Sequence, residues 1–270
     1  MEIMSYEIFF ELSPLNDLDQ LCLLADQDYN YGNKKDWFGY FRGGLHGAVS
    51  RLHAVRTHYN AIHAWVPMPR PPLDAECNLS NVLFGMDSAI ECLTYAMNAI
   101  GNCVDESKFR DIADEKALRR ISPLDVYGDP LRTHPTLPLQ GYSIYFGDVQ
   151  KVWIAARDTM QSIMDQHDVS KHRETIFMGG QTRQDPPVGF FETLGINHDE
   201  MKWPYQPMAE IILDKHPKST KINKYPMPQN DLVIFEQLAE EYRLLIDASV
   251  KCMLTDVKKV FKLNFTSFKK

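Results

Sequence analysis

The clearest pattern in the 270-residue chain is the recurrence of apolar residues every three or four positions. This spacing is typical of amphipathic helices, which bury one side. It covers four long segments: 35–66, 80–103, 145–167 and the stretch that follows Asn230. Shorter helices are predicted at 15–27 and 107–121. The sequence therefore predicts an all-α fold, a bundle of four or five long helices.

Segment 80–103 carries two apolar stripes. One consists of large residues: Leu83, Met86, Ile90, Leu93, Met97 and Ile100. The other consists of small residues: Ala89, Cys92, Ala96, Ala99 and Cys103. Two stripes predict a helix that is buried over much of its circumference, and the small residues predict close approach of a neighbouring helix. Asn78 or Ser80 is expected to cap its N-terminus.

Breaks in the helical pattern suggest how the chain is organised. Residues 1–270 are predicted to form a single helical domain, with a sub-structure boundary in the proline-rich stretch 67–77. Residues 181–207 are predicted to be a long loop, and such loops are often functional. Residues 4–12 could form a short strand or the start of a helix, and residues 208–214 could form a strand that pairs with 5–12 as a minor β-hairpin.

Composition narrows the class of protein. Hydrophobic residues make up 44% of the chain, enough for a substantial core. The net charge of −7 gives no support to broad binding of a nucleic-acid backbone. Five cysteines without a Cys-x-x-Cys pair indicate neither a disulfide framework nor a zinc ribbon. Because no secretory signal and no apolar run of about 18 residues is present, we expect a cytoplasmic protein without a membrane span.

The densest chemistry lies in one short segment that contains His167, Asp168, Lys171, His172 and Arg173. Histidine can shuttle protons or bind metal, and the two cations can neutralise phosphate. A helix C-terminus that gathers cations against its dipole explains the segment equally well. His167 continues the apolar stripe of segment 145–167, so it is expected to face inward. His172 would point about 140° away on a continuous helix, which argues against one metal site shared by both.

Two further sets of polar residues stand beside apolar faces. The first is a line along segment 35–66: His46, His53, Arg56, Asn60 and His63. This line could face a cleft or could be a solvated boundary. The second is Asp87 and Glu91, one turn apart on the buried segment 80–103. A buried acid needs a partner, which we expect from the histidines and arginines of the first line or of residues 167–173. A structural ion pair and a catalytic carboxylate are both consistent with this pattern.

The helix at 80–103 and the polar motif that follows resemble the HEPN superfamily over about residues 80–175. HEPN domains are small, often dimeric helical bundles, and many are metal-independent RNases. Their motif is an arginine, a polar residue and a histidine, matched here by His167, Asp168 and His172. His167 replaces the arginine, so Lys171 or Arg173 would have to hold the phosphate. The resemblance implies a homodimer without a cofactor, with His172 as general base.

A second resemblance points to a different chemistry. His167-Asp168-Val169-Ser170-Lys171 is similar to the His-Asp-x-x-Lys doublet of the HD phosphohydrolase superfamily. That family is also helical and holds a divalent metal with an upstream histidine, the doublet and a downstream aspartate. The resemblance implies a metal site of His53, His167 and Asp168, completed by Asp247 or Asp214.

Three functional hypotheses therefore stand side by side. The first is a HEPN-like protein that binds RNA or a nucleotide, either as a metal-independent RNase or as an inactive relative acting by binding. The second is a metal-dependent phosphohydrolase. The third is a non-enzymatic interaction protein whose loop at 181–207 presents Trp203 and Tyr205 to a partner. The sequence leaves open whether the chain is an enzyme.

Overall fold

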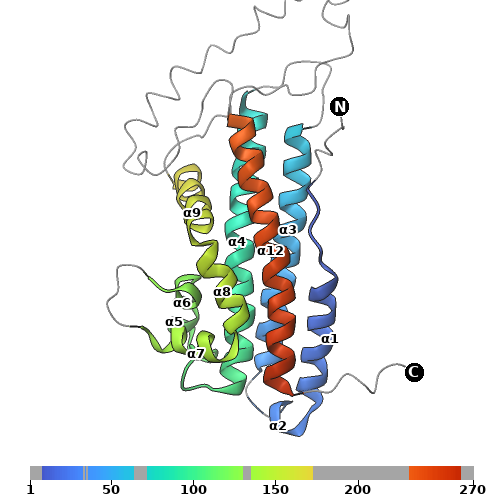
Figure 1. Cartoon of the computed structure of the whole chain (residues 1–270), viewed down its shortest axis with the longest axis vertical. Helices are drawn as coiled ribbons and strands as arrows, with labels where there is room; N and C mark the ends of the chain where they lie inside the picture. Colours follow the sequence, from blue (N-terminus) through green and yellow to red (C-terminus); the bar gives the residue numbers. More distant parts are fainter. Residues whose placement is uncertain are drawn as a thin grey trace, which may run out of the picture. The chain divides into compact units, whose positions relative to one another are not determined.

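The structure, a computed structural model, describes residues 8–32, 34, 36–63, 72–129, 135–172 and 231–262. These residues form ten helices and no strand (Figure 1). The helices are α1 (Ser13–Gln27), α2 (Tyr29–Gly32), α3 (Trp37–His63), α4 (Pro72–Val104), α5 (Glu115–Leu118), α6 (Leu124–Tyr127), α7 (Leu137–Tyr145), α8 (Gly147–Ala155), α9 (Arg157–His172) and α12 (Asp231–Phe261). The predicted all-α fold is therefore confirmed.

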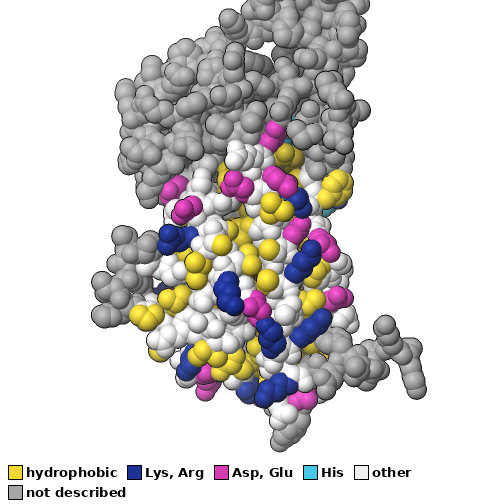
Figure 2. Space-filling view, in the orientation of Figure 1, with side chains coloured by type: hydrophobic (Ala, Val, Ile, Leu, Met, Phe, Trp, Pro, Cys, Tyr) yellow, Lys and Arg dark blue, Asp and Glu magenta, His cyan; other side chains and the backbone are white. Residues whose placement is uncertain are grey.

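The chain divides into two compact units. Unit 1 comprises Met1–Phe9, His53–Asp87 and Thr159–Tyr242. Unit 2 comprises the remaining ranges: Phe10–Leu52, Ser88–Asp158 and Arg243–Lys270. Over the described helices, the face shown in Figure 2 mixes Lys and Arg with Asp and Glu, so it presents no broad surface of one charge.

Unit 1 is built from parts of four helices that contact one another through their side chains. Segments of α3 and α9 run in one direction in Figure 1, and those of α4 and α12 run in the other. Thr159 of α9 donates a hydrogen bond to Glu241 of α12 at 3.0 Å. The buried hydroxyl of Tyr242 in α12 donates to the carbonyl oxygen of Met86 in α4, also at 3.0 Å.

Helix α3 joins α4 and α12 within the same unit. The ring of Tyr59 packs against Phe235 of α12, with centroids 5.6 Å apart. His58 Nδ1 lies 2.9 Å from Asn78 Oδ1 of α4. The aromatic contact removes apolar surface from water, and the polar contact adds a directional link between the two helices.

Unit 2 has a core of large side chains from several helices. The largest fully buried ones include Trp37, Trp153, Tyr142, Phe41, Phe146 and Leu18. Helices α3 and α4 approach closely here, because a Cβ atom added at Gly44 would lie 2.8 Å from both Ala96 N and Cys92 O. The small stripe predicted on segment 80–103 therefore does permit close packing.

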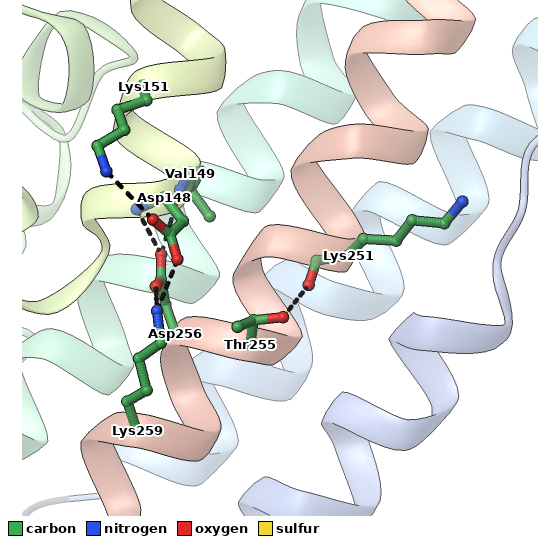
Figure 3. Close-up of polar contacts among 7 residues, drawn as sticks. All are labelled: Asp148, Val149, Lys151, Lys251, Thr255, Asp256 and Lys259. Carbon is green, nitrogen blue, oxygen red and sulfur yellow. Dashed lines mark hydrogen bonds and ion pairs between the residues drawn. The ribbon is translucent and has the colours of Figure 1, made fainter.

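Helix α8 begins against a carboxylate of α12 (Figure 3). Asp256 Oδ2 accepts hydrogen bonds from the backbone N–H groups of Asp148 and Val149 at 3.0 and 3.1 Å. Lys259 bridges the two acids, at 2.6 Å from Asp148 and 3.2 Å from Asp256. Burial raises the pKa of Asp256, whereas the hydrogen bond from Lys259 lowers the pKa of Asp148. A negative charge at the start of α8 also interacts favourably with the positive end of the helix dipole.

Two predicted helix boundaries are wrong. Helix α4 begins at Pro72, so Asn78 and Ser80 lie inside the helix and do not cap it. Proline suits the first turn of a helix because the N–H group that it lacks would have no partner there. The predicted helix at 107–121 is reduced to the single turn of α5, Glu115–Leu118.

Aspartate side chains explain the loss of the helix at 107–121. Asp105 accepts a hydrogen bond from the N–H of Ser107, and Asp111 accepts one from the N–H of Ala113. Asp114 does the same for Lys116 and so caps α5. Such local bonds offer the backbone an alternative to helical pairing.

The predicted helix at 145–167 is two helices, α8 and α9, which meet at Ala156. Ala156 has φ −97° and ψ 13°, and no glycine or proline marks the break in the sequence. Helix α7 was not predicted. Within the predicted strand 5–12, the described residues 8–12 form no strand. The other predicted strand, 208–214, lies outside the described residues. The same holds for the predicted loop 181–207 and for part of the predicted boundary 67–77.

Candidate functional site

The apolar stripe of α9 directs His167 into unit 1. Met160 and Ile163 are fully buried, and His167 is the next residue on the same face, one turn further along. Asp87 lies on α4 beside the buried Met86. The prediction that His167 faces inward is confirmed. Asp87 has the partner that it was expected to need, and of the two segments considered it is 167–173 that supplies it.

Asp87 and His167 form a short, buried contact. Asp87 Oδ2 lies 2.6 Å from His167 Nδ1, and the side chains expose only 10% and 5% of their surface. The ring of Phe84, one turn before Asp87 on α4, packs edge-on against the imidazole at 5.3 Å between centroids. His167 Nε2 and Asp87 Oδ1 are buried and have no hydrogen-bond partner in the described part of the chain.

This geometry sets the chemistry that the pair can perform. A carboxylate that accepts the Nδ1–H of a histidine fixes the tautomer and leaves the lone pair on Nε2. Such an imidazole can accept a proton, and the carboxylate stabilises the imidazolium that results. The pair also ties α4 to α9, and that structural role is the competing explanation for the contact.

The remaining residues of the 167–173 segment are not brought to this pair by any described contact. Helix α9 continues to His172 without a break, so the backbone turns about 140° between the two histidines. Asp168 is exposed. The side chains of Lys171 and His172 lie outside the described ones, as does the whole of Arg173.

The polar line on α3 is mostly solvated. His46, His53 and Arg56 are exposed, and Asn60 is half-buried. The line turns inward at its end, where His63 is only 7% exposed.

Sequence reasoning missed the partner of His63. Its Nδ1 lies 3.7 Å from Glu236 Oε1 of α12, so unit 1 contains a second histidine–carboxylate pair. The only signal in the sequence was that Glu236 directly follows Phe235, a residue of the apolar stripe of the terminal helix.

The described residues contain no group of three or more His, Cys, Asp or Glu side chains placed to hold a metal ion. The proposed ligands His53, His167 and Asp168 therefore do not form such a group. Asp247 accepts hydrogen bonds from the N–H of Glu11 and from Arg243, both at 2.9 Å. The other candidate ligand, Asp214, lies outside the described residues.

Among the described helices, none is both long and apolar enough to cross a membrane. Comparison with known proteins adds no functional information. No protein-family model matches the chain, no curated protein matches it, and no solved structure matches it. The HEPN and HD resemblances therefore rest on the sequence pattern, and the homodimer stays a prediction.

Proposed function

We propose that this chain is an acid–base enzyme that cleaves a phosphodiester, with single-stranded RNA as its substrate class. His167 is the general base and Asp87 is its positioning residue. The observation that carries the proposal is the 2.6 Å contact between Asp87 and His167, which leaves the second ring nitrogen without a hydrogen-bond partner among the described residues. The proposal keeps the reaction expected for a HEPN-like protein and moves the base from His172 to His167.

The reaction needs one proton acceptor beside a ribose. His167 Nε2 takes the proton of a 2′-hydroxyl, and the 2′-oxygen forms a bond to the adjacent phosphorus. The bond from phosphorus to the 5′-oxygen breaks, and that oxygen then takes a proton from the imidazolium or from water. The products are a 2′,3′-cyclic phosphate and a 5′-hydroxyl. Asp87 stabilises the transient imidazolium through its hydrogen bond to Nδ1.

Two residues support an anionic substrate. Lys171 and Arg173 follow His167 closely in the sequence. Lysine and arginine can neutralise the charge that develops on a phosphate. Since the chain carries a net charge of −7, we expect a local contact with RNA rather than a broad basic face.

Burial restricts how the substrate reaches the base. His167 Nε2 is buried, so a 2′-hydroxyl contacts it only after neighbouring side chains move. Phe84, whose ring contacts the imidazole, is half-buried, so it is one of the side chains that would have to move. A single strand can present one ribose on a flexible backbone, whereas a duplex presents a rigid surface.

The test is cleavage of single-stranded RNA labelled with a fluorophore and a quencher, in the presence of EDTA. The proposal expects His167→Gln to slow cleavage by about a hundredfold or more, the usual contribution of a general base. Asp87→Asn should reduce the rate less, because the amide oxygen can still accept the Nδ1–H while the negative charge is lost. His53→Gln, at an exposed histidine of α3, is the matched control and should retain the wild-type rate.

Circular dichroism of each variant separates catalysis from folding. If no RNA is cleaved by the wild-type chain, the proposal is wrong. If folded His167→Gln cleaves RNA at the wild-type rate but unfolds at a lower temperature, the pair has only a structural role. A rate that needs divalent metal and is abolished by EDTA would instead favour the phosphohydrolase hypothesis.

A further inference from the structure

A cavity of about 300 Å³ lies in unit 2, beside the short helix α6 and the N-terminus of α7. Its lining includes Arg110, Arg120, Ser122, Asp125 and Thr136. The volume is at the lower end of the range for small-molecule sites, about 300–1,000 Å³. The lining contains two arginines, two hydroxyl side chains and two carboxylates, because Asp129 lies there beside the buried Asp125.

Arg110 is held firmly at both its backbone and its guanidinium. Its backbone N–H donates to Asn98 Oδ1 at 3.0 Å, and Asn98 Nδ2 donates back to its carbonyl oxygen at 3.0 Å. Asn98 is only 1% exposed. The guanidinium donates from Nε and Nη2 to the two oxygens of Asp125, at 2.9 and 2.8 Å. Asp125 is itself only 6% exposed.

This arrangement leaves donors of Arg110 available. A guanidinium carries five N–H donors, and the fork to Asp125 uses one from Nε and one from Nη2. The hydrogen bond that Arg110 donates to Asp125 raises the pKa of Arg110, so the side chain stays charged. Because the fork is already formed, a ligand that meets the other edge of the guanidinium does not have to order the side chain first.

Two further features favour an anion in the same cavity. Arg120 lies at its rim, is exposed, and makes no side-chain hydrogen bond or ion pair with the rest of the described chain. Thr136 caps the nine-residue helix α7 and accepts a hydrogen bond from the N–H of Leu139 at 3.3 Å. Pro138 has no N–H and that of Leu139 is used by Thr136, so it is the positive end of the helix dipole that favours negative charge here.

We propose that this cavity binds a small molecule bearing a carboxylate or phosphate group, held by Arg110 and Arg120 at the N-terminus of α7. A carboxylate or phosphate oxygen accepts from the available edge of Arg110 in a charge-assisted hydrogen bond. Arg120 closes over the same group from the rim. The site is independent of the Asp87–His167 pair, since all of its residues belong to unit 2.

Isothermal titration of the full chain with inorganic phosphate and, separately, with succinate tests the proposal. Each probe is taken to about 10 mM, a concentration that detects affinities weaker than 1 mM. We expect at least one probe to bind. Binding of phosphate alone assigns a phosphate-bearing ligand, binding of succinate alone assigns a carboxylate, and binding of both assigns a general oxyanion site.

Variants of two adjacent arginines locate the bound anion. Arg120→Gln should weaken binding about tenfold, the loss of one charge-assisted contact. Arg119→Gln is the matched control, because Arg119 is exposed, pairs with Glu115 of α5 and is not among the residues that line the cavity. It should bind the probe like the wild-type chain. His167→Gln should also bind normally, which keeps this test separate from that of RNA cleavage.

The outcomes decide the proposal. Both probes failing to bind, or equal binding by Arg120→Gln and the wild-type chain, would overturn it. Because Arg120 is exposed, its replacement is not expected to unfold the chain, and circular dichroism checks this. Arg110→Lys is a second variant: it keeps the charge but cannot hold the fork to Asp125, so it should also bind more weakly.

Discussion

Two adjacent glycines of α3 should respond in opposite directions to the same substitution. Gly43 is exposed, and a Cβ atom added there meets nothing within 4 Å in the described part of the chain. A Cβ atom added at Gly44 would lie 2.8 Å from Ala96 N and 2.8 Å from Cys92 O, both backbone atoms of α4. Backbone atoms inside a helix cannot rotate away as a flexible side chain can, so the two helices would have to separate.

The magnitudes follow from two opposing effects. Replacing glycine by alanine inside a helix stabilises it by about 0.5–1 kcal/mol, because the unfolded chain loses less conformational freedom. Gly43→Ala should therefore raise the free energy of unfolding by about that amount. Overpacking a closely fitted interface costs about 1–3 kcal/mol, and contact with backbone belongs at the upper end. Gly44→Ala should therefore lower the free energy of unfolding by about 2 kcal/mol after the helix-propensity gain is subtracted.

Thermal unfolding followed by circular dichroism at a helix-sensitive wavelength measures both changes. For a chain of this size about 1 kcal/mol shifts the midpoint by roughly 2–4 °C, so Gly44→Ala should lower it by roughly 4–8 °C. The two variants share one helix, one substitution and neighbouring positions, so their difference reports the α3–α4 contact. A Gly44→Ala chain as stable as the wild type would refute the close approach of these helices.

Two other predictions concern buried polar groups of unit 2. Trp153 Nε1 donates to Ser249 Oγ at 2.8 Å, so Ser249→Ala leaves a buried N–H unpaired and should cost about 1–3 kcal/mol of stability in urea unfolding; no change in the unfolding midpoint would show that the indole has another partner. Burial raises the pKa of Asp256, so the carboxyl group of Asp256 binds a proton more tightly in the folded chain than in the unfolded chain. The resulting stabilisation is complete below the unfolded pKa of about 4 and is lost as the pH rises through the raised pKa. Asp256→Asn cannot ionise, so its unfolding midpoint should vary less with pH above about 4 than that of the wild type, and an unchanged pH dependence would contradict this assignment.

The sequence predicted helices correctly where apolar residues return to one face over many turns. The pattern of segment 35–66 matches α3, and that of the C-terminal segment matches α12. It failed between residues 105 and 145, where α7 was missed and a helix at 107–121 was predicted. In that stretch, local aspartate bonds and short turns decide the backbone, and neither produces a repeating apolar pattern.

The candidate sites also include features that the sequence predicted and features that it did not. The inward direction of His167 followed from its place in the stripe that contains Met160 and Ile163. The need of Asp87 for a partner followed from its place on a buried helix. The cavity around Arg110 was not predicted, since nothing in the sequence marks the fork between Arg110 and Asp125.

The sequence by itself determined that the chain is helical and which side of each long helix is buried, because helical geometry fixes how often an apolar residue returns to one face. Only the tertiary structure decided which residues meet across helices. Asp87 and His167 are 80 positions apart, yet their side chains lie 2.6 Å from each other. A Cβ atom added at Gly44 would meet the backbone of α4, whereas one added at Gly43 would meet nothing within 4 Å among the described residues. Such pairings depend on how distant segments pack together, and a periodic pattern on one helix does not encode the identity of its neighbour.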